Sequence, residues 1–153
     1  MAAFFFDSSA LVKLYVNETG TAWVKSLADP VVGNRLYITR IAGVEVISAI
    51  IRRRSTEAIN VNDAATAIAD FRRDLVDLYI IIEVDASLIT HAMLLVEAHA
   101  LRGYDAVQLA AALKAQDQRL TSGLLPPTLI SADVALNDAA VIEGLNVDDP
   151  NDH

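Results

Sequence analysis

Apolar runs that look like buried strands alternate with segments of helical periodicity along most of the 153-residue chain. In the helical segments, apolar residues recur at every third or fourth position. This alternation is typical of an α/β domain with a mainly parallel sheet, here of about five strands. The predicted strands are Ala2 to Phe6, Leu36 to Thr39, Tyr79 to Val84, Thr128 to Ser131 and Leu145 to Val147. The predicted helices are Ser9 to Val16, Ile41 to Arg54, Asn62 to Leu78, Ser87 to Leu101 and Ala106 to Gln116.

The length of the chain suits one domain, which we place at residues 1–147. Residues 148–153 are acidic and have little to bury, so we predict a disordered tail there. No stretch approaches the roughly 18 apolar residues that a membrane span needs. The opening MAAFFF ends at Asp7 and lacks a basic leader, which favours a first strand over a signal peptide. We therefore expect a soluble, cytoplasmic protein without a membrane partner.

Composition excludes some kinds of chemistry and weighs against others. The chain has no cysteine, which removes disulfides, thiolate metal sites and cysteine nucleophiles. Its formal charge of -8 opposes general binding to nucleic acid, because affinity for the phosphate backbone comes mainly from lysine and arginine. Arginines are grouped at Arg52 to Arg54 and at Arg72 and Arg73. We interpret both groups as solvated helix faces in preference to substrate contacts.

Four acidic residues stand near the predicted carboxyl edge of the sheet. Asp7 directly follows the first strand, and Asp133 follows the fourth. Asp105 opens a helix, and Glu45 lies about one turn into the helix after the second strand. In parallel α/β sheets, functional sites form outside the carboxyl ends of the strands. We therefore expect the four acids to share one crevice.

Each acid alone has a simpler explanation, because aspartate caps helices and acids are favoured in a first helical turn. Glu45 is the exception, since its neighbours indicate an inward-facing side of the helix, where a carboxylate needs a partner. Four converging carboxylates would repel one another and raise each other's pKa, so the cluster is stable mainly when it holds a cation. Oxygen ligands of this kind select Mg²⁺ or Mn²⁺, which suits phosphodiester hydrolysis by a metal-activated water.

The four acids are predicted to be catalytic, with different roles. Asp7 and Asp105 are expected to bind the metal directly. Glu45 and Asp133 are expected to hold metal-bound waters or a second ion, and to serve as a base. The residues predicted to orient the carboxylates or water, with ordinary capping as the alternative, are Ser9, Thr39, Ser131 and Asn137.

The acids lie in longer runs, namely Phe6 to Tyr15 (FDSSALVKLY), Thr39 to Glu45, Tyr104 to Ala110 (YDAVQLA) and Ser131 to Leu136 (SADVAL). In their order and local context, these runs resemble the PIN-domain ribonucleases, and in particular the VapC-like toxins of type II toxin-antitoxin systems. The resemblance implies a three-layer α/β/α sandwich and a Mg²⁺- or Mn²⁺-dependent RNA endonuclease. It also implies a homodimer and a small antitoxin that binds the groove beside the site. The acidic residues of the family correspond to Asp7, Glu45, Asp105 and Asp133.

Three functions remain open: a toxin-type ribonuclease, a PIN-type nuclease that processes RNA without an antitoxin, and a non-catalytic α/β interaction module. The predicted helices at 41–54 and 62–78 form a hairpin with apolar stripes. Such a hairpin suits dimerisation, binding of a partner helix, or packing within the domain. His91 and His99 lie far in sequence from every acid, so we assign both to structural roles.

Overall fold

The computed structural model describes all residues from 1 to 153 and contains one five-stranded parallel sheet. The order of the strands is β3-β2-β1-β4-β5, so β1 lies at the centre. Every neighbouring pair is parallel, which confirms the predicted α/β class. The strands are β1 (Ala3–Phe6), β2 (Arg35–Thr39), β3 (Ile80–Ile82), β4 (Thr128–Ile130) and β5 (Asn146–Asp148).

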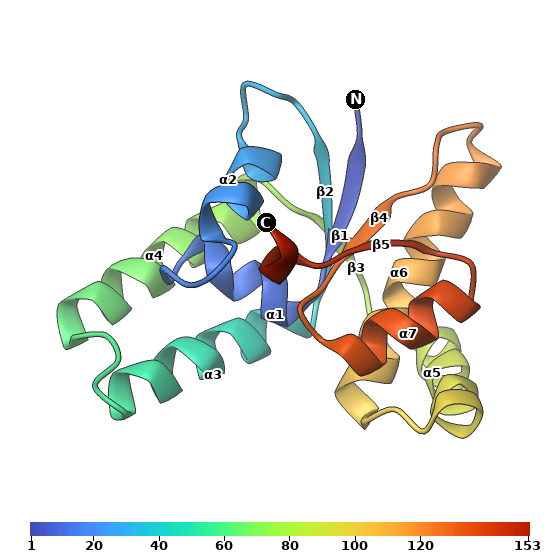
Figure 1. Ribbon diagram of the computed structural model, residues 1–153. Helices are drawn as coiled ribbons and strands as arrows, with labels where there is room; N and C mark the ends of the chain where they lie inside the picture. Colours follow the sequence, from blue (N-terminus) through green and yellow to red (C-terminus); the bar gives the residue numbers. More distant parts are fainter.

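Helices cover both faces of the sheet and complete the three layers (Figure 1). One face carries α1 (Ser8–Leu11), α2 (Thr21–Ala28), α3 (Ala42–Ser55) and α4 (Val61–Asp77). The other face carries α5 (Ala86–His99), α6 (Gly103–Thr121) and α7 (Val134–Ile142). Two short 3-10 helices are η1 (Val12–Leu14) and η2 (Pro150–Asp152). None of the helices combines the length and the apolar character that crossing a membrane would require.

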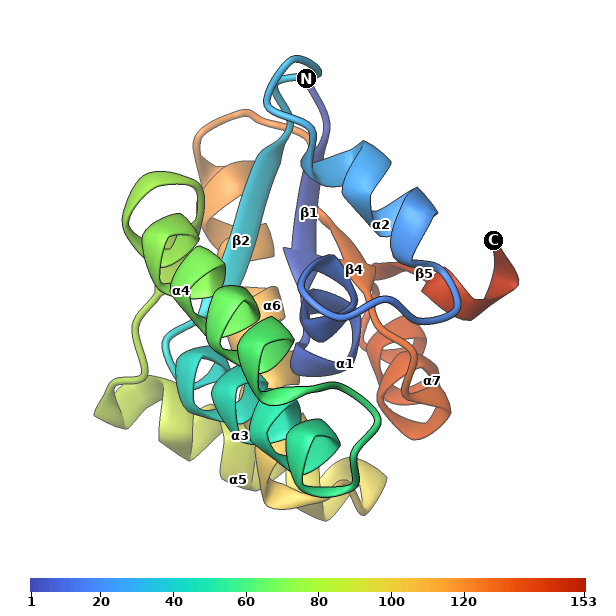
Figure 2. The same cartoon turned by 90° about the vertical axis from the view of Figure 1, so that its left-hand side faces the viewer.

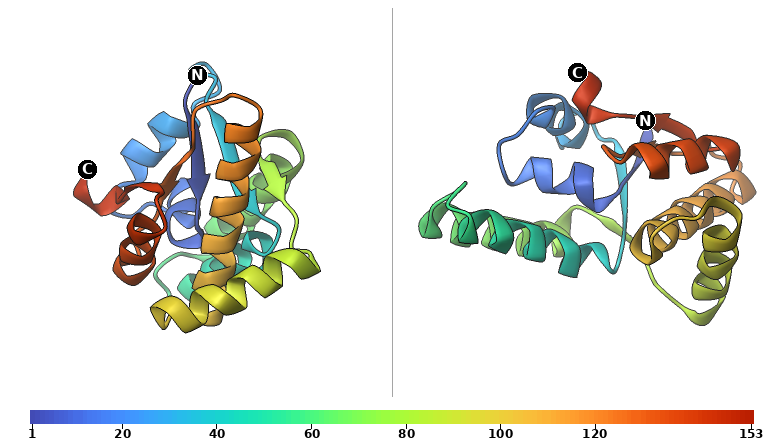
Figure 3. Two further views of the ribbon diagram at one scale, coloured as in Figure 1. Left: turned by 90° about the vertical axis from the view of Figure 1, so that its right-hand side faces the viewer. Right: turned by 60° about the horizontal axis from the view of Figure 1, so that its bottom comes forward.

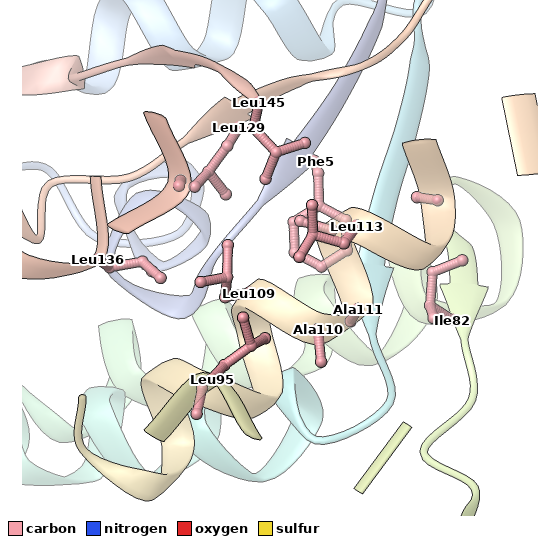
Figure 4. Close-up of a cluster of buried hydrophobic side chains, with 14 of the residues drawn as sticks. Phe5, Ile82, Leu95, Leu109, Ala110, Ala111, Leu113, Leu129, Leu136 and Leu145 are labelled. Atoms are coloured by element: carbon pink, nitrogen blue, oxygen red, sulfur yellow. The ribbon is translucent and has the colours of Figure 1, made fainter. Parts of the chain in front are cut away.

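Each face of the sheet has its own hydrophobic core. Successive side chains of a strand point to opposite faces, so Phe5 and Phe6 of β1 enter different cores. Phe5 packs with Leu109 and Leu129 beneath α5 to α7, as Figure 4 shows. Phe6 lies in the second core with Phe71 of α4. Burial on both faces explains why the strands read as nearly continuous apolar runs.

The order of the strands reverses beside β1. The chain proceeds from β1 through β2 to β3, then returns to place β4 on the other side of β1. Figure 2 shows β2 and β4 on opposite sides of β1. Asp7 N–H donates to the carbonyl of Ile130 at 3.2 Å, which joins the ends of β1 and β4. A crevice at the carboxyl edge is expected at such a reversal. Figure 3 (right) brings that edge of the molecule forward.

The structure departs from the sequence-based prediction near the two ends of the chain. The helix predicted at Ser9 to Val16 is instead α1 followed by η1, and α2 was not predicted. Residues 148–153, predicted to be a disordered tail, form the end of β5 and then η2, which lies beside α2 (Figure 2). Pro150 is buried, and the His153 ring stacks on Trp23 with centroids 3.9 Å apart. Pro150 and His153 thus hold the segment against the domain, although its acidic composition predicted disorder.

We predict that Gly20→Ala destabilises the protein more than Gly123→Ala does. Both glycines have positive φ angles, +85 and +71, so both substitutions strain the backbone. A Cβ on Gly20 would also lie 2.2 Å from the Pro150 carbonyl oxygen, whereas a Cβ on Gly123 would meet nothing within 4 Å. We expect the free energy of unfolding to fall by about 1 kcal/mol for Gly123→Ala and by at least about 2 kcal/mol for Gly20→Ala.

Urea unfolding followed by fluorescence measures both losses, because Trp23 is the only tryptophan and lies beside η2. Equal losses for the two variants would contradict the contact between Gly20 and Pro150.

Candidate active site

The structure brings the four acids together in one pocket of about 510 Å³ at the carboxyl edge of the sheet. Asp7 follows β1, and Asp133 precedes α7. Glu45 lies in the first turn of α3, and Asp105 in the first turn of α6. Four elements far apart in sequence therefore supply one group of carboxylates.

Asp7 is the most enclosed of the four, with 3% of its surface exposed. One carboxylate oxygen accepts hydrogen bonds from Ser9 Oγ at 2.6 Å and from Ala10 N–H at 3.0 Å. The other accepts from Ser131 Oγ at 2.8 Å. Burial raises the pKa of Asp7 to about 6, even though these hydrogen bonds lower it, and the negative charge of Asp133 raises it further.

Ser9 and Ser131, both predicted to support the site, connect the ends of β1 and β4. Ser9 Oγ accepts from Ala132 N–H at 2.9 Å, and Ser131 Oγ accepts from Asp133 N–H at 3.1 Å. Asn137 contributes indirectly, since its side-chain amide donates to the Ser131 carbonyl at 2.8 Å. These contacts fix Asp7 relative to the loop that carries Asp133.

Glu45 is half-buried and its carboxylate contacts α6. The helix face inferred to point inward is not the buried one, however, since Val44 is 68% exposed and the buried residues of α3 are Ala42, Val46, Ala49 and Ile50. Gln108 Nε2 donates to Glu45 Oε1 at 3.0 Å and to Ser8 Oγ at 2.9 Å. Burial raises the pKa of Glu45, Gln108 and Ser8 lower it, and the nearby charge of Asp105 raises it. The partner that a half-buried carboxylate requires is therefore an amide and not a cation.

Asp105 and Asp133 are less constrained than Asp7. The Asp105 side chain accepts no hydrogen bond within the chain, and burial followed by the charge of Asp133 raises its pKa, which Arg102 lowers. Asp133 caps α7 by accepting from Leu136 N–H at 3.0 Å through Oδ1, so its Oδ2 makes no such bond. Both residues thus keep carboxylate oxygens available to a ligand.

The donor set of the pocket fits a hard divalent cation. None of the four carboxylates forms an ion pair with lysine, arginine or histidine, although they interact electrostatically with one another. The buried amide oxygen of Gln108 also lacks a partner. However, no three acidic, histidine or cysteine side chains are close enough together to hold one ion as they stand. Binding would therefore require the less constrained side chains to rotate.

Thr39 and the arginines of α3 lie differently with respect to the pocket. Thr39 does not line the pocket, because it is fully buried and its hydroxyl lies 3.5 Å from the Ile82 carbonyl. Arg52 and Arg53, interpreted as part of a solvated helix face, line the pocket, and Arg53 is half-buried and pairs with Glu18. A run of three arginines on a helix does not reveal which of them points toward the site.

Sequence reasoning did not select several residues of the pocket. Gln108 lies three positions after Asp105, a spacing that puts both on one side of α6, and this was an available signal. Lys13 lies inside a strongly apolar run. Nothing in that run indicates that its side chain is buried and lines the same pocket as the acids. The other residues of the pocket that sequence reasoning did not select include Ser8, Glu18, Ser48 and Tyr104.

Comparison with known proteins identifies the family. Residues 4–141 match the PIN domain family. Ribonuclease VapC45 of Mycobacterium tuberculosis is 37% identical over 123 residues, which cover 78% of this chain and 81% of that protein. A toxin-antitoxin complex from Klebsiella pneumoniae shares the fold with a TM-score of 0.60 at 20% identity, covering 96% of this chain and 97% of that one.

VapBC2 from Rickettsia felis, solved bound to a DNA fragment from its promoter, also shares the fold, with a TM-score of 0.60 at 13% identity and coverage of 96% and 98%. These two likenesses concern the fold alone. The family match extends from β1 into α7, and the identity to the mycobacterial protein holds over most of both chains. On these grounds, the chain belongs to the PIN domain family.

Proposed function

We propose that this protein is a divalent-metal-dependent endoribonuclease that acts in the cytoplasm as the toxin of a toxin-antitoxin pair. The observation that carries the proposal is the group of four carboxylates in one pocket without a paired cation. The family supports a nuclease, and the similarity to Ribonuclease VapC45 supports RNA as the substrate. The likeness to a toxin-antitoxin complex supports an antitoxin as partner.

Asp7 and Asp105 would hold the metal, either Mg²⁺ or Mn²⁺, with Glu45 and Asp133 beside it. The bound ion would polarise the phosphate and lower the pKa of a water, as divalent ions do in phosphodiester hydrolysis. Asp7 is suited to a fixed position because Ser9 and Ser131 hold both of its oxygens. The freer carboxylates of Asp105 and Asp133 are suited to adjusting to the ion and to accepting a proton from water.

Gln108 has a positioning role in this proposal. Its amide donates to Glu45 and so keeps that carboxylate directed toward α6. The same amide group also contacts Ser8, at the start of α1, so one side chain connects α6 with α1 and α3. The pocket walls can thereby keep their spacing while the other acids rotate.

A second and more apolar pocket, which we call the α3–α4 groove, would bind the antitoxin. It has a volume of about 830 Å³ and shares Val44, Ser48 and Arg52 with the acidic pocket. A protein segment seated there would therefore lie directly beside the catalytic acids. The apolar residues of the groove are Ile41, Val44, Ile47, Ile51, Leu75 and Val84. The homodimer would use an apolar helical surface elsewhere, such as the exposed Met93 and Leu94 of α5.

Two other functions would give different observations. A PIN-type nuclease in RNA processing would cleave RNA with the same acids but would have no gene for a small DNA-binding antitoxin directly upstream. A non-catalytic interaction module would bind neither Mg²⁺ nor Mn²⁺ in this pocket. Metal binding and the gene neighbourhood therefore separate the three.

We predict that Asp105→Asn abolishes Mn²⁺-dependent RNA cleavage while leaving the fold intact. Asp105 accepts no hydrogen bond that the fold would lose, so the change removes a ligand charge at little structural cost. The rate should fall at least about 100-fold, since changes to residues that only support a ligand already cost about 10- to 100-fold. Asp117→Asn is the matched control, because Asp117 is exposed on the same helix and outside the pocket. Cleavage by Asp105→Asn at the rate of Asp117→Asn would overturn the metal site.

We predict that Asp7→Asn changes the pH dependence of stability in the metal-free protein. The pKa of Asp7 is about 6 in the folded protein, above its ordinary value of 3.8. The stability that this proton supplies is fully present below about pH 4 and is lost as the pH rises through 6. Asp7→Asn has no proton to lose there, so its stability relative to the natural protein should rise by on the order of 3 kcal/mol between pH 4 and 7.

Urea unfolding in EDTA at a series of pH values measures this difference. A difference between the two proteins that stays constant from pH 4 to 7 would contradict the raised pKa. Added Mn²⁺ should stabilise the natural protein more at pH 7 than at pH 5, because the ion binds the ionised carboxylate.

We predict that Ile51→Asp prevents binding of the antitoxin encoded with this protein. Ile51 lines the α3–α4 groove and belongs to neither hydrophobic core, so a charge there should disturb binding more than folding. Val76→Asp is the matched control, since Val76 is 84% exposed on α4 and outside the groove. Calorimetric titration with the purified antitoxin should show no binding for Ile51→Asp and unchanged binding for the control. Unchanged binding by both variants would place the antitoxin elsewhere.

A further inference from the structure

Lys13 is an unusual residue to find in the wall of the acidic pocket. It lies in η1, only 5% of its surface is exposed, and it still lines the pocket. Its ammonium donates no hydrogen bond within the chain, and the nearest carboxylate oxygen, Glu18 Oε2, is 3.5 Å away. An ammonium has three donors, and a buried one is costly unless it is well paired. Lys13 is therefore a poorly compensated charge.

Glu18 compensates Lys13 only in part because its carboxylate is also engaged by Arg53. Glu18 Oε1 lies 2.6 Å from Arg53 Nε and 2.5 Å from Arg53 Nη2, a close two-point contact. Only the other oxygen faces Lys13, at the longer distance. The three side chains carry two positive charges and one negative charge, so this part of the pocket wall has a surplus of one positive charge.

The group is held in place by a buried hydroxyl. Thr21 Oγ1 donates to the Lys13 carbonyl at 2.9 Å and accepts from the Glu18 N–H at 2.9 Å. Thr21 is 5% exposed. The backbones of Lys13 and Glu18 are thus fixed to each other, and the surplus charge is preorganised instead of carried on a mobile surface side chain.

We propose that Lys13 binds a backbone phosphate of the RNA strand in the pocket, and that Glu18 weakens this binding by partly neutralising Lys13 and Arg53. This inference rests on the proposed ribonuclease function and adds to it a specific phosphate contact. The phosphate completes the pairing of Lys13, which the chain itself leaves incomplete. It also explains how a protein of charge -8 binds RNA, since a positive part of the wall lies in the same pocket as the acids.

The presence of both negative and positive side chains in the pocket supports this assignment. The four acids and the cations Lys13, Arg52 and Arg53 line the same pocket, and none of these cations forms an ion pair with the four acids. A strand whose reacting phosphate lies at the acids needs a cation for the charge of a neighbouring phosphate. A lysine is a compact charge that suits a single phosphate oxygen.

The experiment compares RNA binding by Lys13→Met and Lys25→Met. Lys25 is an exposed lysine on α2 outside the pocket, which makes it the matched control. Binding of fluorescein-labelled single-stranded RNA is measured by anisotropy at several KCl concentrations, in the Asp105→Asn background to prevent cleavage. Each phosphate contact contributes about 0.7 to the slope of log affinity against log salt. A role confined to folding would not change this slope.

We expect Lys13→Met to weaken binding about tenfold and to lower the magnitude of the salt slope by about 0.7, whereas Lys25→Met changes neither. Lys13→Arg should restore the slope because it keeps the charge. Glu18→Gln should do the opposite of Lys13→Met, with tighter binding and a steeper slope, and it decides the question if Lys13→Met fails to fold. Equal slopes for Lys13→Met and Lys25→Met, or weaker binding by Glu18→Gln, would overturn the proposal.

The cleavage assay separates failure of this inference from failure of the proposed function. If the natural protein cleaves RNA and the slopes are equal, only the role of Lys13 is wrong. If the natural protein neither cleaves nor binds RNA, the ribonuclease proposal fails, and the phosphate contact fails with it.

Discussion

Asp7 places an ionisable carboxylate at the end of the central strand, where almost no solvent reaches it. Such a group is costly unless hydrogen bonds or a cation compensate it. The chain supplies three donors, from Ser9, Ala10 and Ser131, and these also join the ends of β1 and β4. Burial still dominates and keeps the pKa near 6. The free-energy cost of ionising Asp7 that remains is the reason to expect a bound cation. The other residues of the site are arranged around Asp7.

The topology explains why the other three acids face this position. β1 lies between β2 and β4, and the direction of winding reverses there. The helix after β2 carries Glu45, α6 lies against the sheet with Asp105 at its start, and the loop after β4 carries Asp133. Two of the acids, Asp7 and Asp133, also cap the helices that they begin. The capping and the catalytic interpretations of these residues are therefore compatible, since one carboxylate can serve both.

The sequence predicted the strands and the positions of the acids well because both follow from local patterns. Strands buried on both faces must be apolar throughout, and the ends of parallel strands meet at one edge. Contacts between distant segments were not predictable in this way. The burial of Lys13, its weak pairing with Glu18, and the docking of His153 on Trp23 depend on which helix faces which. The contact of the Thr39 hydroxyl with the Ile82 carbonyl of β3 likewise depends on how two strands that are distant in sequence pair.

The proposed chemistry requires at least one divalent ion to bind among Asp7, Glu45, Asp105 and Asp133. A crystal structure of the protein soaked in Mn²⁺, with an anomalous difference map, tests it most directly. We expect an anomalous peak in this pocket, with Asp7 and Asp105 as ligands and with the Asp105 side chain turned from its present position. Full occupancy of Mn²⁺ elsewhere in the molecule and no peak in this pocket would contradict the claim.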